Sequence, residues 1–325
     1  MKIMKRCSVF NEEIKKFLHQ VDDGKFRYDP DYASIPCNET SDAVKLCQEP
    51  LVSVLMAAYN HEEFIRQAID GVMMQQTDFA FELIIGEDCS SDKTREICFE
   101  YQRRYPEKIR VLWSETNQYD DGKSFGRMWH NIRGKYIAFC EGDDFWTDPL
   151  KLQKQIDVMR RNPTVGVCLA LTDVLKADSG RIEKAKPERF PSGVVKSPKA
   201  VKYVLWGKRF RFRRLKRSHM QTSGFLFDRS VLERNRPLYD EIFNLHLSFD
   251  DTSELTFMVF YSDLYILHDS CSVYRRWSNG FSVKNSKLLN RDKERFCAFW
   301  RRRVDGWSVF RIILSRGLGG IYAKV

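Results

Sequence analysis

The sequence lacks the cysteine patterns and long apolar runs that mark several classes of protein. Its nine cysteines lie singly along the chain, without a CxxC pair, which disfavours a structural zinc site. No run of about 18 apolar residues occurs, so no segment is expected to span a membrane. The first sixteen residues are basic but hold no apolar core of a signal peptide. These absences, with unpaired thiols in odd number, predict a cytoplasmic protein with reduced cysteines.

Glycine-based phosphate motifs are missing as well. There is no GxGxxG after the first apolar run and no GxxxxGK[ST] anywhere, which disfavours a dinucleotide oxidoreductase and a P-loop NTPase. The six histidines form no HxxxH pair. The 325 residues suit one large domain or two, and 43% are hydrophobic, as in ordinary globular proteins. The net charge of +10 favours phosphate-bearing ligands, nucleic acid or an anionic membrane surface, without choosing among them.

Four short apolar runs in the first half of the chain are typical of strands buried in a sheet. They cover residues 51–58, 81–86, 109–113 and 136–139. Between them apolar residues recur at helical spacing, most clearly from Phe64 to Met73. Strands that alternate with helices predict an α/β fold with a mostly parallel, Rossmann-like sheet flanked by helices.

Polar and acidic side chains follow three of these predicted strands. They are Tyr59 and Asn60, then Glu87 and Asp88, then Glu141, Asp143 and Asp144. Because parallel strands end at one edge of a sheet, these groups are expected to converge on one crevice. Close carboxylates need compensation by a cation or by hydrogen bonds, and Mg²⁺ or Mn²⁺ suits carboxylate and phosphate oxygens. The alternative for residues 141–144 alone is an acidic turn that caps the next helix.

Three segments of the first half resemble family 2 glycosyltransferases, which have the GT-A fold. They are SVLMAAYNHEEFIRQAIDGVMMQ, FELIIGEDCSSDKT and GKYIAFCEGDDFWTDPLKLQKQ, in the expected order and spacing. The chain departs from the family where Ala57 replaces a frequent proline and where Glu87 and Glu141 replace frequent aspartates. Both acidic changes keep the charge and lengthen the side chain by one carbon.

This resemblance implies inverting transfer of a sugar from a nucleotide sugar, with a UDP-sugar favoured, to a hydroxyl of a saccharide or lipid-linked saccharide acceptor. The nucleotide would be bound by residues at the strand ends. These are Ala58, Tyr59 and Asn60 beside the base, Glu87 and Asp88 on base and ribose, and Glu141 near the ribose. Asp143 would bind the Mg²⁺ or Mn²⁺ that bridges the diphosphate. Asp144 and Trp146 would lie behind it or on the acceptor side.

The second half of the family pattern is carried by a helix that opens near residue 250. The resemblance implies that an aspartate at its start is the catalytic base, with Asp251 preferred and Asp250 second. The alternative is that both aspartates only cap the helix, where an acidic group is favourable anyway. Arg127 and Arg275, the latter in the segment VYRRW, are candidate phosphate contacts.

Two basic segments allow partners other than a nucleotide sugar and its acceptor. Residues 208–217 hold seven cations, which could form a solvated face, a phosphate- or lipid-facing surface, or a nucleic-acid site. Residues 291–325 hold nine Lys or Arg against three Asp or Glu, with several aromatics. Such a tail could lie on an anionic membrane surface, or pack on the domain or a second subunit.

We therefore expect an N-terminal extension (1–49), a GT-A domain (50–280) and a basic amphipathic helical tail (281–325). The GT-A domain would divide into a nucleotide-binding half (50–150) and an acceptor half (151–280). The expected function is a metal-dependent hexosyltransferase of surface polysaccharide biosynthesis, peripheral at the inner face of a membrane. A sugar nucleotidyltransferase is the first alternative, although no Gly-rich basic loop follows the first strand. A basic nucleic-acid-binding protein is the second, with no specific nucleic acid expected.

Overall fold

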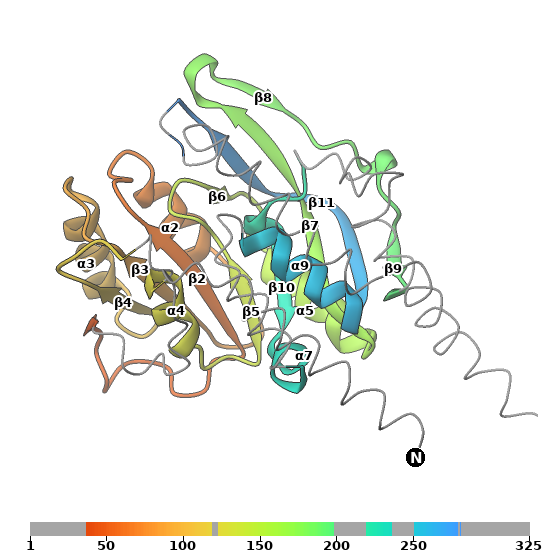
Figure 1. Cartoon of the computed structure of the whole chain (residues 1–325), viewed down its shortest axis with the longest axis horizontal. Coiled ribbons are helices and arrows are strands. Elements are labelled where there is room, and N and C mark those ends of the chain that lie inside the picture. Colours follow the sequence, from red (N-terminus) through yellow and green to blue (C-terminus); the bar gives the residue numbers. More distant parts are fainter. Residues whose placement is uncertain (1–36, 119–122, 198–218, 236–249, 279, 281–325) are drawn as a thin grey trace, which may run out of the picture.

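A computed structural model describes residues 37–118, 123–197, 219–235, 250–278 and 280. In chain order its strands are β1 (Asn38–Thr40), β2 (Val52–Ala58), β3 (Phe81–Glu87), β4 (Ile109–Trp113), β5 (Tyr136–Phe139), β6 (Phe145–Trp146), β7 (Val165–Lys176), β8 (Arg181–Glu183), β9 (Gly193–Val195), β10 (Phe225–Asp228) and β11 (Asp263–Arg276). Its α-helices are α2 (Ile65–Met73), α3 (Thr94–Arg104), α4 (Lys123–His130), α5 (Lys151–Arg161), α7 (Arg229–Arg234) and α9 (Asp250–Tyr261). All the strands belong to one sheet, shown in Figure 1.

The first half of the sheet is parallel, as predicted. Its strands lie in the order β4-β3-β2-β5, and each neighbouring pair runs in the same direction. The four predicted apolar runs are these four strands, with bounds that agree within one residue. Strands β2 and β3 are buried along almost their whole length, since helices cover both faces.

The second half of the sheet is mixed. Strand β10 lies antiparallel between β5 and β7, and β11 then runs parallel to β7. Strand β11 has 14 residues and pairs with β7 through several register shifts. Its last residues reach the edge where β6 is added antiparallel. The GT-A-type α/β architecture predicted from the sequence is thus confirmed, with a mixed half that the pattern did not reveal.

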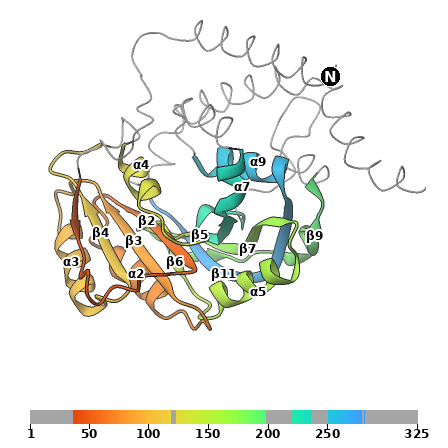
Figure 2. The same cartoon turned by 90° about the horizontal axis from the view of Figure 1, so that it is seen from below.

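Helices cover the two faces of the sheet, as Figure 2 shows from below. Helices α2, α3 and α5 pack on one face, where Ile65, Ile97 and Leu152 are fully or almost fully buried against the strands. Helices α4, α7 and α9 lie on the other face, where Met128 and Phe257 join the second apolar cluster. The strands of the parallel half end at one edge of the sheet, between these two layers of helices.

The remaining segments lie at the edges of the sheet or outside the described residues. The segment 177–197 contains the short strands β8 and β9, which pair with β7 and β11. Strand β1, from the expected extension, pairs with β4. The basic segments 208–217 and 281–325 lie outside the described residues. Within the described part of the chain, no helix combines the length and apolarity that a membrane crossing needs.

Candidate active site

The ends of β2, β3 and β5 are joined to one another by backbone hydrogen bonds. Asp88 N donates to Ala58 O at 3.1 Å, and Gly142 N donates to Ala57 O at 3.0 Å. A Cβ on Gly142 would lie 2.7 Å from His61 Nδ1 and 2.8 Å from Ala57 O, so the close approach requires glycine. The three polar strand ends predicted from the sequence therefore meet at one edge of the sheet, near β2 in Figure 1.

Glu87 is buried and held by protein groups. Its side chain has 0% exposure, and its two oxygens accept from Ser90 N and from Arg95 Nε, each at 2.6 Å. Arg95 in turn donates to Ser114 O and stacks on Trp113, with its guanidinium 4.9 Å from the ring centroid. This carboxylate shapes the loop that follows β3. Its predicted contact with base or ribose stays a prediction.

Asp88 and Arg127 form a buried ion pair near Glu87. Arg127 Nη2 lies 3.3 Å from Asp88 Oδ1, which also accepts from Gln118 N at 3.0 Å. Arg127 is 1% exposed, yet its Nε and Nη1 have no hydrogen-bond partner within the described residues, nor does the buried Gln118 Oε1. Burial lowers the pKa of Arg127, an effect that the Asp88 charge opposes. Buried polar atoms of this kind are expected to have partners, which leaves these atoms available to a ligand or to ordered water.

The loop beside β2 is built around Asn60. Its backbone has a φ of 55°, and its Oδ1 accepts from Ser91 N at 2.8 Å. Cys89, in the loop after β3, also has a positive φ of 61°. Tyr59 is 47% exposed next to this loop, whereas Ala58 is buried at 2%. Tyr59 therefore offers an open aromatic face at the edge, and Ala58 can offer mainly its backbone.

The acidic loop after β5 is tied to the turn before β10. Ser223 Oγ donates to Asp144 Oδ2 at 2.7 Å and accepts from Glu141 N at 3.3 Å. Arg275 N donates to the second oxygen, Asp144 Oδ1, at 2.9 Å. Burial raises the pKa of Asp144 well above its usual range, and the charge of Asp143 adds to this effect. Asp144 is thus a buried support of the loop.

Asp143 is more open, and it can hold a cation. Its Oδ2 accepts from Trp277 Nε1 at 3.0 Å, and its backbone oxygen accepts from Arg275 Nε at 2.8 Å. Within the described part of the chain, no three His, Cys, Asp or Glu side chains gather to enclose a metal. Mg²⁺ is commonly held by one or two carboxylates and completed by water and substrate phosphates. The donor set fits a cation of this kind, delivered with a diphosphate.

Two other predicted residues are engaged by the protein. Arg275 donates through Nη2 to Gln67 Oε1 at 2.7 Å, and its guanidinium lies 4.5 Å from the ring centroid of Phe64. Its contact with a phosphate stays a prediction. Trp146 is 2% exposed and donates to Ser223 O at 2.9 Å, so it supports the loop from behind. Its contact with an acceptor stays a prediction.

The predicted base lies at the start of α9. The helix begins at Asp250, as the sequence indicates, but the side chains of Asp250 and Asp251 lie outside the described residues. Three residues that organise the site were not predicted from the sequence: Arg95, Ser223 and Trp277. Of these, only Trp277 carries a signal, because it ends the VYRRW segment.

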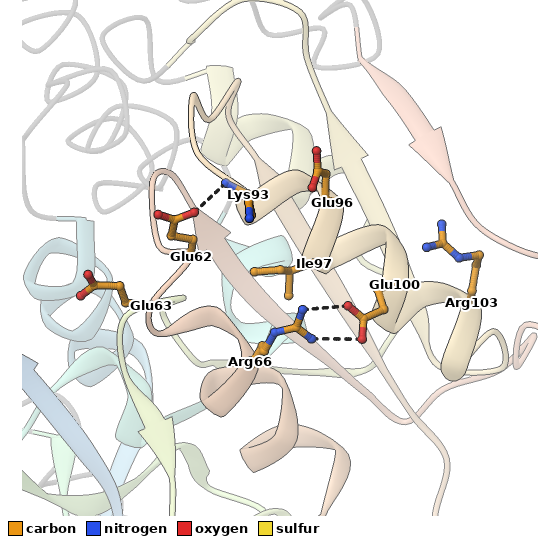
Figure 3. Close-up of a pocket in the computed structure, with 8 residues that line it drawn as sticks. All are labelled: Glu62, Glu63, Arg66, Lys93, Glu96, Ile97, Glu100 and Arg103. Carbon is orange, nitrogen blue, oxygen red and sulfur yellow. Dashed lines mark hydrogen bonds and ion pairs between the residues drawn. The ribbon is translucent and has the colours of Figure 1, made fainter.

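An open groove of about 490 Å³ lies on the outer side of the same sheet edge, between α2 and α3 (Figure 3). It is lined almost entirely by charged side chains: Glu62, Glu63, Arg66, Lys93, Glu96, Glu100 and Arg103, with Ile97. Arg66 and Glu100 form a two-pronged ion pair across it, at 3.0 and 2.8 Å. None of the predicted site residues lines this groove. The strand ends therefore stay the candidate active site.

Comparison with known sequences points to one family. A family model described as Glycosyl transferase family 2 matches residues 53–236, more than half of the chain. The uncharacterized protein Rv1520 of Mycobacterium tuberculosis is 33% identical over 257 residues, which are 79% of this chain and 66% of the relative. The putative teichuronic acid biosynthesis glycosyltransferase TuaG of Bacillus subtilis is 35% identical over 113 residues, or 34% of this chain and 42% of the relative. The chain thus spans just under two thirds of the mycobacterial relative.

Solved structures share the fold. Residues 1–349 of S. aureus TarS, in complex with UDP-GlcNAc, align with a TM-score of 0.51 at 18% identity, covering 69% of this chain and 58% of that one. The mannosyltransferase PcManGT of Pyrobaculum calidifontis, in complex with GDP-Man and Mn²⁺, aligns with a TM-score of 0.50 at 16% identity. That alignment covers 78% of this chain and 64% of the other.

Proposed function

Because the chain belongs to glycosyl transferase family 2, we propose that it transfers a sugar from a nucleotide-sugar donor to an acceptor hydroxyl, with inversion at the anomeric carbon. The acceptor would be a saccharide or lipid-linked saccharide of a surface polysaccharide. Support comes from TuaG, whose name places it in teichuronic acid biosynthesis. The first alternative from the sequence, a sugar nucleotidyltransferase, finds no support in these comparisons.

The observation that carries this proposal is the buried guanidinium of Arg127 beside Asp88. Arg127 presents two buried N–H groups without partners among the described residues, beside a carboxylate that accepts hydrogen bonds. A nucleoside offers complementary groups, since bases carry adjacent ring N–H donors and carbonyl acceptors, and riboses carry hydroxyls. The exposed ring of Tyr59, on the neighbouring strand end, would cover the flat face of the base. This position favours a nucleoside contact for Arg127 over the phosphate contact expected from the sequence.

Asp143 would hold the divalent cation, Mg²⁺ or Mn²⁺, which when bound compensates the charge of the diphosphate leaving group. The protein's own part is to keep this carboxylate in place, through Trp277 and Arg275. Asp251, or Asp250 in its place, would accept the proton of the acceptor hydroxyl as that oxygen attacks the sugar. Attack from the face opposite the leaving diphosphate inverts the anomeric carbon.

A UDP-sugar is the donor we favour, because the TarS structure of the same fold was solved with UDP-GlcNAc. PcManGT was solved with GDP-Man, so the fold accommodates more than one base. Contact of residues 291–325 with an anionic membrane surface would bring the enzyme to a lipid-linked acceptor, and it remains our proposal for that segment.

The decisive experiment is calorimetric binding of UDP, GDP and CMP, each with and without Mn²⁺. It compares the wild type with Asp143→Ala and with Asp78→Ala, a control at an exposed acid that pairs with Arg160 on the surface. We expect one nucleotide to bind in a Mn²⁺-dependent way to the wild type and the control, and to lose that dependence in Asp143→Ala. Failure of all three nucleotides to bind the folded protein would overturn the proposal. If the wild type and Asp143→Ala instead bound nucleic acid with equal, salt-dependent affinity, the nucleic-acid alternative would be favoured.

A further inference from the structure

The carboxylate of Asp143 is held from one side by an indole. Trp277 Nε1 donates to Asp143 Oδ2 at 3.0 Å, between residues 134 positions apart in the sequence. Both side chains are partly exposed, so the pair lies at the surface of the site. Within the described residues no hydrogen bond is made to the other oxygen, Oδ1. One oxygen is fixed by the protein and the other is left for a ligand.

The indole itself has little freedom to turn. Its ring packs edge-on against Phe64, with centroids 5.0 Å apart and an interplanar angle of 68°. Gly280 N donates to Trp277 O at 3.1 Å, and a Cβ on Gly280 would lie only 3.1 Å from Nε1. The N–H is therefore presented to Asp143 by a ring enclosed between the start of α2 and the turn after β11.

The end of β11 also holds the backbone of this loop. Arg275 Nε donates to Asp143 O at 2.8 Å, and Arg275 N donates to Asp144 Oδ1 at 2.9 Å. Arg275 is itself fixed by Gln67 at 2.7 Å, on helix α2, which begins directly after the Phe64 that contacts Trp277. With the backbone of Asp143 anchored in this way, the remaining freedom of its side chain lies in the carboxylate torsions. Those torsions are what the indole N–H restricts.

Building on the proposed function, we infer that Trp277 is a positioning residue for the divalent cation. Its N–H fixes Asp143 through Oδ2 so that Oδ1 meets the cation that arrives with the nucleoside diphosphate. Groups that orient a metal ligand raise metal affinity, because the ligand loses less freedom on binding. Trp277 thus acts through Asp143, without needing to touch the metal.

The test measures Mn²⁺ affinity from the electron paramagnetic resonance signal of free Mn²⁺. The protein is saturated with UDP, or with GDP if calorimetry identifies GDP as the nucleotide that binds. Trp277→Phe keeps an aromatic ring next to Phe64 and removes the N–H donor together with the second ring of the indole. We expect its Mn²⁺ affinity to fall by about 10-fold or more. The matched control is Tyr101→Phe, which removes an aromatic side chain's hydrogen bond to Asp70 Oδ1 at 2.9 Å and is expected to leave Mn²⁺ affinity unchanged. Asp143→Ala is measured alongside.

The outcomes separate the inference from the function on which it rests. If Asp143→Ala retains Mn²⁺ binding, the proposed metal site itself is wrong. If Asp143→Ala loses Mn²⁺ while Trp277→Phe binds it as tightly as the wild type, or more tightly, the positioning role of Trp277 is refuted. Should Trp277→Phe fail to fold, benzothienylalanine at position 277 replaces the N–H by sulfur in a ring of the same size. The same loss of affinity is expected for it.

Discussion

Ser223 donates a hydrogen bond to Asp144 across 79 residues of sequence, with its Oγ 2.7 Å from Asp144 Oδ2. This bond joins the turn before β10 to the acidic loop after β5. The same hydroxyl accepts from Glu141 N, so one small side chain orders both ends of the loop. Since Asp144 is 2% exposed, water cannot readily replace the serine.

Ser223→Ala is therefore expected to lower the free energy of unfolding by about 1–3 kcal/mol, because a buried carboxyl loses its donor. Urea denaturation measures this change. Ser179→Ala is the control, since the exposed Ser179 hydroxyl makes only a 3.4 Å contact with Lys176 O. A Ser223→Ala protein as stable as the control would show that the bond contributes nothing net.

The buried ion pair of Glu87 and Arg95 gives a second prediction. Replacing Arg95 by leucine leaves the fully buried Glu87 carboxylate without its cation, and should cost about 3–5 kcal/mol of stability. Arg66→Leu breaks the exposed pair with Glu100, whose side chains are 50% and 52% exposed, and should cost at most about 1 kcal/mol. Thermal or urea unfolding of the two variants compares them directly. Equal losses would contradict the role of Arg95 as the cation that compensates the buried Glu87 carboxylate.

Lys151 predicts a dependence of stability on pH. Its side chain is fully buried, with Nζ 4.0 Å from the ring centroid of Trp146 and 2.9 Å from Gln155 Oε1, and burial lowers the pKa of Lys151 from 10.5 to about 8. Between about pH 8 and 10.5 the unfolded chain binds more protons at this position than the folded chain, so the free energy of unfolding rises with pH. The total contribution is roughly 3 kcal/mol.

The measurement is urea denaturation from pH 7 to 10.5 for the wild type and Lys151→Met. Burial raises the pKa of the Cys140 and Cys168 thiols, which gives an opposite slope above their usual pKa of 9.0 in both proteins. The difference between the two proteins isolates the lysine. The free energy of unfolding of the wild type should rise relative to that of Lys151→Met as pH increases. Parallel curves of unfolding free energy against pH would contradict the prediction.

Gly142→Ala tests the close approach of the acidic loop to β2. The added methyl would meet His61 Nδ1 and Ala57 O at less than 3 Å, so the loop must move, at a cost of about 1–3 kcal/mol. Because Asp143 moves with it, Mn²⁺-dependent nucleotide binding should weaken in calorimetry. Gly180→Ala serves as the comparison, since its φ of 66° brings backbone strain while nothing lies within 4 Å of the new methyl. It should affect stability alone.

Much of the parallel half and its polar edge could be predicted from the sequence. Strands β2 and β3 are continuous apolar runs, and parallel strands that end in Asn60 and Asp88 must present these side chains at one edge. The insertion of β10 between β5 and β7 could not be predicted, because pairing partners depend on packing across distant segments. The same limit applies to Arg275, since its sequence position does not reveal that Asp143 O and Gln67 already engage its N–H groups.

The place of β10 in the sheet also affects how the chain can fold during synthesis. Once residues 52–139 have left the ribosome, β2, β3, β4 and β5 can pair, but β5 keeps an open hydrogen-bonding edge until residues 225–228 emerge. A strand edge that is paired in the folded protein but still open during synthesis is a site where chains associate wrongly. A fragment cut after the acidic loop would carry that open edge permanently. We therefore expect that expression of the parallel half of the sheet requires the later strand, supplied in the same chain or added as a peptide.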